Sequence, residues 1–280
     1  MNHFNPTHRS AVNSHPRISI IVAVLNGMKT IERCLNSIFC QTYPNTELIV
    51  MDGNSTDGTQ GVLMSQSEKI AYWESKPDGG IYHAWNKALR HATGEWICFL
   101  GADDCFYDSF ALEKTAPLLS KALAQGCRLA YGQVAKVNAA GNVVQILGKP
   151  WEKISWQIRH GMPVHLPHPG MMHHRSLFEE HGLFDERFKI AGDYEFLLRE
   201  LKNPAGKAFY LGFPVVRFGI GGISEANRLA TIKEARKARL KHGLPPSWLW
   251  SLVFLRASAR KFLPQTFQKR LNNLPWQTKI

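Results

Sequence analysis

The stretch Ile18-Ser-Ile-Ile-Val-Ala-Val-Leu25, followed by Asn26-Gly27, decides the class of fold. It is a nearly continuous run rich in β-branched residues, which is typical of a strand buried on both faces of a parallel sheet. Asn26-Gly27 interrupts the run, as expected where a strand ends in a turn. The sequence therefore predicts a buried parallel strand near the N-terminus.

Segments of helical and strand periodicity then alternate up to residue 100. They are a helix at Thr30–Cys40, a strand at Glu47–Met51, a helix from Thr59, a strand near Ile70–Trp73, a helix at Ile81–Ala92 and a strand at Trp96–Leu100. This βαβαβαβ order predicts an α/β fold with a doubly wound, mostly parallel, Rossmann-like sheet. Ligands of such sheets bind beyond the carboxyl ends of the strands, so the polar loops there are predicted to line a site.

The second half of the chain is less regular. Its predicted elements are a hairpin of Leu129–Val137 with Val143–Leu147, helices at Ser176–His181 and Asp193–Leu201, a basic helix at 228–242 and an amphipathic helix at Trp248–Phe262. We expect a flexible N-terminus over residues 1–16, one main domain over 17–225, and a basic, amphipathic helical tail over 226–280.

The charge of the chain is concentrated in that tail. The 280 residues are 44% hydrophobic and 20% charged, which suits a globular protein, and the formal net charge is +12. Between Arg228 and Arg270 the only acidic residue is Glu234. Because the charge is appended to the fold, and no zinc-finger, RNA-binding or basic-leucine pattern is present, we expect no nucleic-acid partner.

The cysteines and the apolar segments indicate a compartment. The five cysteines contain no C-x-x-C pair, which suits a reducing environment. Residues 1–16 include no apolar signal segment, and no apolar run reaches the roughly 18–20 residues that span a bilayer. The sequence predicts a cytoplasmic protein, soluble or peripheral on the inner face of the cell membrane.

Asp103-Asp104, directly after the strand Trp96–Leu100, is the first candidate site. Adjacent carboxylates repel each other unless a cation or a proton lies between them. Mg²⁺ and Mn²⁺ prefer such oxygen ligands, and Mg²⁺ usually binds through one or two carboxylates plus substrate phosphates. The alternative is a simple Asp-Asp turn. Since the chain has no P-loop and no G-x-G-x-x-G, a metal at this pair is the predicted holder of a diphosphate.

Asp52, at the end of the second strand, begins the polar loop Asp52–Gly58. A carboxylate at this position can accept hydrogen bonds from a base N–H or a ribose hydroxyl. The alternative is that the acidic and small residues of this loop shape turns and cap the next helix.

Five of these segments, in this order, resemble family 2 glycosyltransferases with the GT-A fold. They are Ile18–Asn26, Glu47–Thr59, Ser75–Lys87, Thr93–Glu95 and Leu100–Asp104. The resemblance is dense over residues 17–110 and looser to about residue 225. It implies a nucleotide-sugar-binding half at 17–110 and an acceptor-binding half at 111–225.

The resemblance also implies roles for single residues. It assigns binding of the nucleotide-sugar to residues of these strand-end segments: Val24, Asn26, Asp52, Asn54, Ser55, Asp57, Lys76, Asp78, Asn86 and Asp103. Asp104 would ligate the metal, with Asp103 beside it and nearer the ribose-phosphate. The implied cofactor is Mg²⁺ or Mn²⁺.

Asp193, at the start of a predicted helix, is the candidate catalytic residue. An acid at this position is commonly only a helix-terminal charge. The resemblance makes Asp193 the general base that deprotonates the acceptor hydroxyl, with Glu195 as the second candidate in the acceptor pocket. Two positions depart from the family pattern: many relatives have Asp in place of His83 and Glu in place of Gly192.

Three further features carry weaker functional signals. The histidines His165, His168, His173 and His174 fit no zinc spacing, and His168 is predicted to line an acceptor or phosphate pocket. The loop Gly219–Ser224 either closes over the donor or forms a turn. The basic tail either lies on an anionic membrane surface, packs on the main domain or contacts a partner.

We conclude that the sequence predicts an inverting, metal-dependent glycosyltransferase. Its donor would be a nucleoside-diphosphate sugar, its acceptor a saccharide or lipid-linked saccharide, and its setting bacterial cell-surface polysaccharide synthesis. The alternatives are a nucleotidyltransferase that makes a nucleotide-sugar and a non-catalytic protein that binds a nucleotide-sugar or a polysaccharide.

Overall fold

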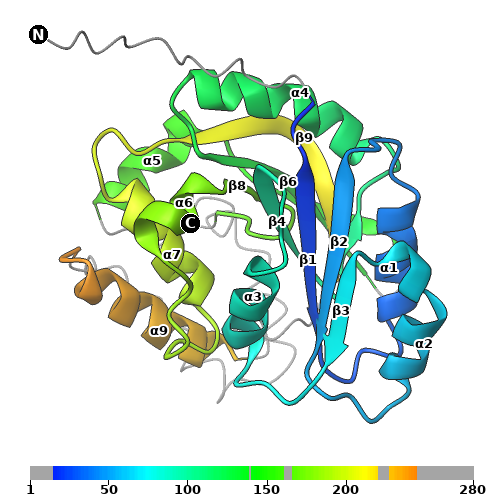
Figure 1. Ribbon diagram of the computed structural model, residues 1–280. Helices are drawn as coiled ribbons and strands as arrows, with labels where there is room; N and C mark the ends of the chain where they lie inside the picture. The colour runs from blue at the N-terminus through cyan, green and yellow to red at the C-terminus, as the bar shows by residue number, and fades with distance from the viewer. Residues whose placement is uncertain (1–14, 139, 161–165, 220–226, 245–280) are drawn as a thin grey trace, which may run out of the picture.

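Strand β1 (Ile18–Val24) lies inside the sheet, as its nearly continuous apolar run predicts (Figure 1). This computed structural model describes residues 15–138, 140–160, 166–219 and 227–244. Strands β2 (Thr46–Asp52) and β4 (Trp96–Gly101) pair with β1 on either side, and β3 (Tyr72–Ser75) pairs with β2. All three pairings are parallel. These four strands therefore end at the same edge of the sheet.

The second half of the chain extends the same sheet with strands of mixed direction. The full order is β3-β2-β1-β4-β8-β6-β9-β5, with β7 paired to β6. The added strands are β5 (Cys105–Phe106), β6 (Leu129–Val137), β7 (Val143–Leu147), β8 (Met172–His174) and β9 (Ala208–Gly219). The β6–β9 pair is parallel, whereas β5, β7 and β8 are antiparallel to their neighbours.

Helices cover both faces of the sheet because alternate strand residues point to opposite sides. Ile20 and Val22 belong to the core that packs on α1 (Ile31–Phe39), α2 (Thr59–Ser65) and α4 (Ala111–Ala124). Ile21 belongs to the opposite core, whose helices are α3 (Ile81–Leu89), α5 (Trp151–Arg159), α6 (Ser176–His181), α7 (Gly192–Leu201) and α9 (Arg228–Lys241). Each of these isoleucines is fully buried, which stabilises the fold by about 1.5–3 kcal/mol per side chain. Figure 1 shows the two helical layers with the sheet between them.

The predicted α/β class with a mostly parallel, doubly wound sheet is confirmed. The helices and strands predicted up to residue 100 are present, as is the β6–β7 hairpin. Strand β3 lies about two residues later than predicted, because Ser67–Lys69 form a short 3₁₀ turn that ends at Ile70. Elements α4, α5, β5, β8 and β9 have no counterpart in the prediction. None of the helices within the described ranges combines the length and apolar character needed to cross a membrane.

Candidate active site

The carboxyl ends of β1 to β4 bring the predicted donor-binding segments together. In the register of the sheet, Asp52 pairs with Val24 on one side and with Ser75 on the other. Gly101, at the end of β4, pairs with Ala23. The loops that contain the predicted acidic residues therefore leave the sheet side by side, as the strand order requires.

Side chains of the β2–α2 loop tie it to the β1–α1 loop. The backbone amide of Asn26 donates to Ser55 Oγ at 2.7 Å, and the backbone amide of Met28 donates to Asp57 Oδ2 at 3.0 Å. Asn26 and Asn54 have left-handed backbones, with φ of 52° and 69°, a conformation that asparagine tolerates better than most residues. These predicted donor-binding residues thus build the rim of the site, and their contact with a nucleotide stays a prediction.

Asp52 is fully buried beneath this rim. Its Oδ2 accepts hydrogen bonds from the Ser55 amide at 2.9 Å and from Ser75 Oγ at 2.5 Å, and its Oδ1 accepts from Ser55 Oγ. The turn-shaping role that the sequence left open is therefore present. The predicted contact of Asp52 with a nucleoside remains a prediction.

Asp103-Asp104 makes a tight turn after β4, in which the Asp104 amide donates to the Gly101 carbonyl at 3.0 Å. Asp103 is exposed, whereas Asp104 is only 3% exposed. Burial, and secondly the neighbouring charge of Asp103, raises the pKa of Asp104 well above its ordinary value. The turn therefore carries one exposed and one buried carboxyl group at the edge of the site.

The surroundings of Asp104 fit a divalent cation. Its Oδ1 is buried and has no hydrogen-bond partner among the described residues. A β-carbon at Gly101 would come 2.7 Å from Asp104 Oδ2 and 2.9 Å from Asp103 Oδ1, so glycine lets both carboxylates fold back on the strand end. A buried, unpaired oxygen is costly, and a hard cation would relieve that cost. Asp104, with Asp103 beside it, would hold the metal.

Arg33 is a neighbour of this pair that the sequence did not reveal. From α1, its Nη2 donates to the Asp103 carbonyl at 3.0 Å. This contact fastens the Asp103-Asp104 turn to the helix and places a positive charge at the edge where a diphosphate is predicted. The sequence did contain one signal for this role, because Arg33 is a cation on the polar face of α1, the helix that follows the loop after β1.

The segment after β3 forms a second turn at the same edge. A β-carbon at Gly53 would come 3.1 Å from Asp78 Oδ2, so Asp78 lies against the β2 loop. His83 Nδ1 accepts the Gly79 amide at 2.8 Å, which assigns His83 a local role at the start of α3. Lys76 is 70% exposed and pairs with Glu74 at 3.0 Å. Its predicted contact with the nucleotide stays a prediction.

Tyr82, in the first turn of α3, connects Asp193 to this edge of the sheet. The Tyr82 hydroxyl lies 3.1 Å from Asp193 Oδ1 and 2.8 Å from the Ile190 carbonyl, and these two oxygens share its single proton. The Asp193 side chain is 26% exposed. Burial and the nearby Asp193 raise the pKa of Tyr82 well above its ordinary value, so the hydroxyl remains a donor. A partly exposed carboxylate is thereby held beside the donor-binding segment.

His168 lies on the other side of Asp193, with its Nδ1 4.0 Å from Asp193 Oδ2. The ring is 9% exposed and stacks on Trp85 and Phe99. Burial lowers the pKa of His168 to about 4, so the contact with Asp193 is not an ion pair at neutral pH. His168 thus lies next to the candidate base, and its predicted contact with acceptor or phosphate stays a prediction.

Gly192 accounts for one of the departures from the family pattern. A β-carbon there would lie 2.8–2.9 Å from three ring carbons of Tyr82, which is closer than real contacts allow. A glutamate at this position cannot coexist with the present Tyr82 ring. The absence of a glutamate at residue 192 therefore goes together with the position of the Tyr82 ring, whose hydroxyl contacts Asp193. Tyr82 itself had no role in the prediction.

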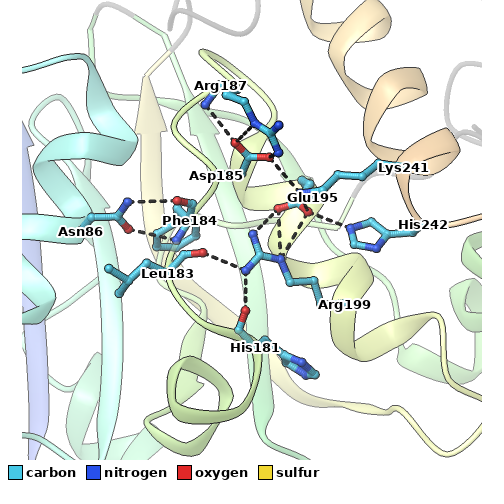
Figure 2. Close-up of polar contacts among 10 residues, drawn as sticks. All are labelled: Asn86, His181, Leu183, Phe184, Asp185, Arg187, Glu195, Arg199, Lys241 and His242. Carbon is cyan, nitrogen blue, oxygen red and sulfur yellow. Dashed lines mark hydrogen bonds and ion pairs between the residues drawn. The ribbon is translucent and has the colours of Figure 1, made fainter.

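Asn86 and Glu195 make contacts that differ from those predicted (Figure 2). Asn86 is 4% exposed, and its side chain donates to the Phe184 carbonyl at 3.0 Å and accepts the Phe184 amide at 3.0 Å. Glu195 is fully buried, and its carboxylate pairs with Arg199 at 2.5 Å and with Lys241 at 2.6 Å. Asn86 thus joins α3 to the loop after α6, and Glu195 joins α7 to the end of α9. The predicted donor contact of Asn86 and acceptor contact of Glu195 stay predictions.

The remaining predictions concern histidines, a loop and the tail. His173 is fully buried, and the ring Nδ1 of His174 lies 2.8 Å from Ser176 Oγ. Within the part of the chain that the structure describes, no three or more His, Cys, Asp or Glu side chains are grouped so that they could hold a metal ion. His165, residues 220–224 of the glycine-rich loop and residues 245–280 of the tail lie outside the described residues.

Similar proteins share this sequence pattern and fold. Residues 19–182 match the family model described as glycosyl transferase family 2. The chain is 29% identical over 214 residues to the "PGL/p-HBAD biosynthesis glycosyltransferase" of Mycobacterium tuberculosis, an alignment that covers 75% of this chain and 79% of that protein.

Solved structures with the GT-A type of glycosyltransferase fold are also similar. S. aureus TarS 1-349 in complex with UDP-GlcNAc gives a TM-score of 0.60 at 18% identity, over 80% of this chain and 66% of that chain. The mannosyltransferase PcManGT from Pyrobaculum calidifontis, in complex with GDP-Man and Mn²⁺, gives 0.62 at 22% identity, over 82% and 65%. The chain thus spans just under two thirds of the length of these two solved chains.

Proposed function

The chain belongs to glycosyl transferase family 2, and from this premise we propose that it transfers a sugar from a nucleoside-diphosphate sugar to an acceptor hydroxyl with inversion. The observation that carries the proposal is the Asp193 carboxylate, held by Tyr82 beside the donor-binding segment and partly open to solvent. Two structurally similar proteins were solved with nucleotide-sugars, UDP-GlcNAc and GDP-Man, which supports this class of donor.

Asp193 acts as the general base. A sugar hydroxyl is a weak nucleophile until a positioned carboxylate takes its proton in the transition state. The acceptor oxygen bonds to the anomeric carbon as the bond from that carbon to the diphosphate breaks, and the acceptor proton passes to Asp193. Because the attack is a single displacement from the face opposite the leaving group, the configuration at the anomeric carbon inverts.

Asp104 and Asp103 hold Mg²⁺ or Mn²⁺ in this proposal. When bound, the cation supplies positive charge that stabilises the departing nucleoside diphosphate. The unpaired, buried oxygen of Asp104 supports this assignment. Mn²⁺ is present in the complex of the similar mannosyltransferase, which supports use of a divalent cation.

We also propose the division of labour that the sequence suggested. Residues 17–110 bind the donor, residues 111–225 bind the acceptor, and residues 226–280 form a basic tail. The acceptor is a saccharide or lipid-linked saccharide of bacterial cell-surface polysaccharide synthesis, and the mycobacterial relative's name, which refers to PGL/p-HBAD biosynthesis, supports a biosynthetic role.

The tail then places the protein on the inner face of the membrane through its excess of Lys and Arg. Sedimentation with anionic vesicles, but not with neutral ones, is the expected result. Equal sedimentation with both kinds would contradict the membrane role.

The reaction class is tested with a panel of nucleotide-sugars in the presence of Mn²⁺ and saccharide acceptors. The expected result is release of a nucleoside diphosphate with one donor, together with a glycosylated product whose anomeric configuration, measured by NMR, is inverted. Exchange of pyrophosphate into the donor would instead indicate a nucleotidyltransferase. Donor binding without release across the panel would indicate a binding protein, and a product of retained configuration would contradict inversion.

A further inference from the structure

Glu234, the single acidic residue between Arg228 and Arg270, lies on α9 and points at the segment that precedes α7. Its carboxylate accepts hydrogen bonds from three consecutive backbone amides. The distances are 3.0 Å from the Lys189 nitrogen to both oxygens, 2.8 Å from Ile190 and 2.9 Å from Ala191. These amides belong to the three residues that immediately precede α7, and a carboxylate near a helix N-terminus interacts favourably with the helix dipole.

The same three residues connect directly to the candidate base. The Ile190 carbonyl accepts the Tyr82 hydroxyl, which in turn lies 3.1 Å from Asp193. Lys189 Nζ donates to the Gly79 carbonyl at 3.0 Å, in the donor-binding segment. Asp193 itself follows Ala191 by only two residues. A shift of this segment would therefore move the carboxylate and the hydroxyl that holds it.

Two further contacts from α9 act on the same helix. Arg239 Nη1 donates to the Tyr194 hydroxyl at 3.1 Å, and Lys241 pairs with Glu195. Helix α9 thus contacts the segment before Asp193 and the two residues after it. The Glu234 contact includes Ile190, whose carbonyl accepts the Tyr82 hydroxyl.

We propose that Glu234 is a positioning residue for sugar transfer: by holding the amides of residues 189–191, it fixes the direction in which Asp193 faces the acceptor. The inference rests on the proposed role of Asp193 as the general base. It also places α9 inside the catalytic unit, beyond the boundary that the sequence predicted at residue 225. The role is indirect, because Glu234 contacts backbone amides rather than substrate.

Kinetics of Glu234→Ala and Glu234→Gln test the proposal, with Lys233→Ala, an exposed neighbour on the same helix, as the matched control. Displacement of a catalytic group by about 1 Å can cost about 10²-fold in rate. We expect Glu234→Ala to lower kcat by about 10- to 100-fold while donor affinity changes less than about twofold. Glu234→Gln, which keeps one carbonyl oxygen as acceptor, should lose less. Lys233→Ala should behave like the wild type.

Hydrogen exchange measures the contact without relying on activity. The amides of residues 189–191 should exchange faster in Glu234→Ala than in the wild type or in Lys233→Ala. Unchanged exchange would overturn the proposal. So would a folded Glu234→Ala variant with wild-type kcat, or parallel losses of kcat, donor affinity and melting temperature in both Glu234 variants, which would indicate a purely stabilising role.

A failure of the proposed function would give results different from those of a failure of the Glu234 proposal. If Asp193→Asn retained turnover, the base assignment would fail whatever the Glu234 variants did. Full turnover in Glu234→Ala beside an inactive Asp193→Asn would overturn only the positioning role of Glu234. If Glu234→Ala does not fold, Glu234→Gln provides the same comparison with a side chain of nearly equal shape.

Discussion

The Tyr82 ring and Gly192 together decide where the Asp193 carboxylate lies. Asp193 stands in the first turn of α7, where an acid often serves only the helix dipole. The Tyr82 hydroxyl instead connects it to α3, and the absence of a side chain at residue 192 leaves room for the ring. At the scale of single residues, glycine at position 192, where many relatives have glutamate, thus goes together with the position of the Tyr82 ring.

Asp193→Asn should remove most turnover and spare donor binding. The amide cannot take the acceptor proton, and general-base help is typically worth about 10²–10⁴-fold. Steady-state kinetics with the active donor, and calorimetric titration of the same donor, check the two parts. Near-normal turnover in this variant would show that Asp193 is not the base.

Asp104→Ala should abolish the effect of a divalent cation on donor binding. The variant removes the buried oxygen that lacks a partner, so the fold should tolerate the change. Donor affinity measured with and without Mn²⁺ gives the metal-linked difference. A difference equal to that of the wild type would rule out Asp104 as the principal ligand.

At the scale of elements, one buried carboxylate fastens α7 to α9 and to the loop that follows α6. Glu195 pairs with Arg199, Lys241 and His242, as Figure 2 shows. Arg199 also donates to the carbonyls of His181 and Leu183, at 2.7 Å and 2.8 Å. The two helices therefore share a charged contact whose carboxylate is fully buried.

Glu195→Ala should lower the free energy of unfolding by about 3 kcal/mol or more, because it removes the fully buried carboxylate that pairs with Arg199 and with Lys241. The Glu195 side chain is fully buried, and that of Arg199 is 14% exposed. Lys241→Ala, which removes a side chain that is 36% exposed, should cost about 1 kcal/mol or less. Urea denaturation of both variants provides the comparison, and equal losses would contradict this account.

At the scale of the whole molecule, buried histidines make stability depend on pH. Burial lowers the pKa of His168 from 6.5 to about 4, and that of His173 well below its ordinary value. The unfolded chain binds a proton to each ring more readily than the folded protein does. Stability is therefore constant above the unfolded pKa of 6.5 and falls as the pH drops from there toward 4.

The change of the free energy of unfolding with pH should be measurable between pH 6 and pH 5. Each buried, neutral histidine contributes a loss of up to about 1.4 kcal/mol per pH unit in that window, and Asp104, whose raised pKa acts in the opposite direction, offsets part of the total. Glu195 has a lowered pKa, so its contribution is lost only below the ordinary glutamate value of 4.5. Urea midpoints at several pH values should fall with acidification, and His168→Phe should flatten the slope. Constant stability from pH 6.5 to 5 would contradict the prediction.

The first half of the fold could be predicted because its signals are local. The apolar run Ile18–Leu25, the helical spacing that follows it and the loops that interrupt the pattern are properties of neighbouring residues. Strand β8 has three residues, and β9 contains Gly212 and Pro214, which break its pattern. These strands exist because neighbouring strands of the sheet supply their hydrogen bonds, so their sequences alone did not reveal them.

For the site, local sequence patterns were enough to predict the family, the strand-end placement of Asp52 and Asp103-Asp104, and the start of a helix at Asp193. The long-range partners of the polar groups, by contrast, depend on how the folded chain brings distant residues together. Asn86 contacts a residue 98 positions away, and the amides held by Glu234 lie 43–45 positions from it. Hydrogen bonds depend on distances in space that a local pattern does not contain, so the partners of Tyr82 and Glu234, and the pairing of Glu195 with Lys241, are visible only in the folded chain.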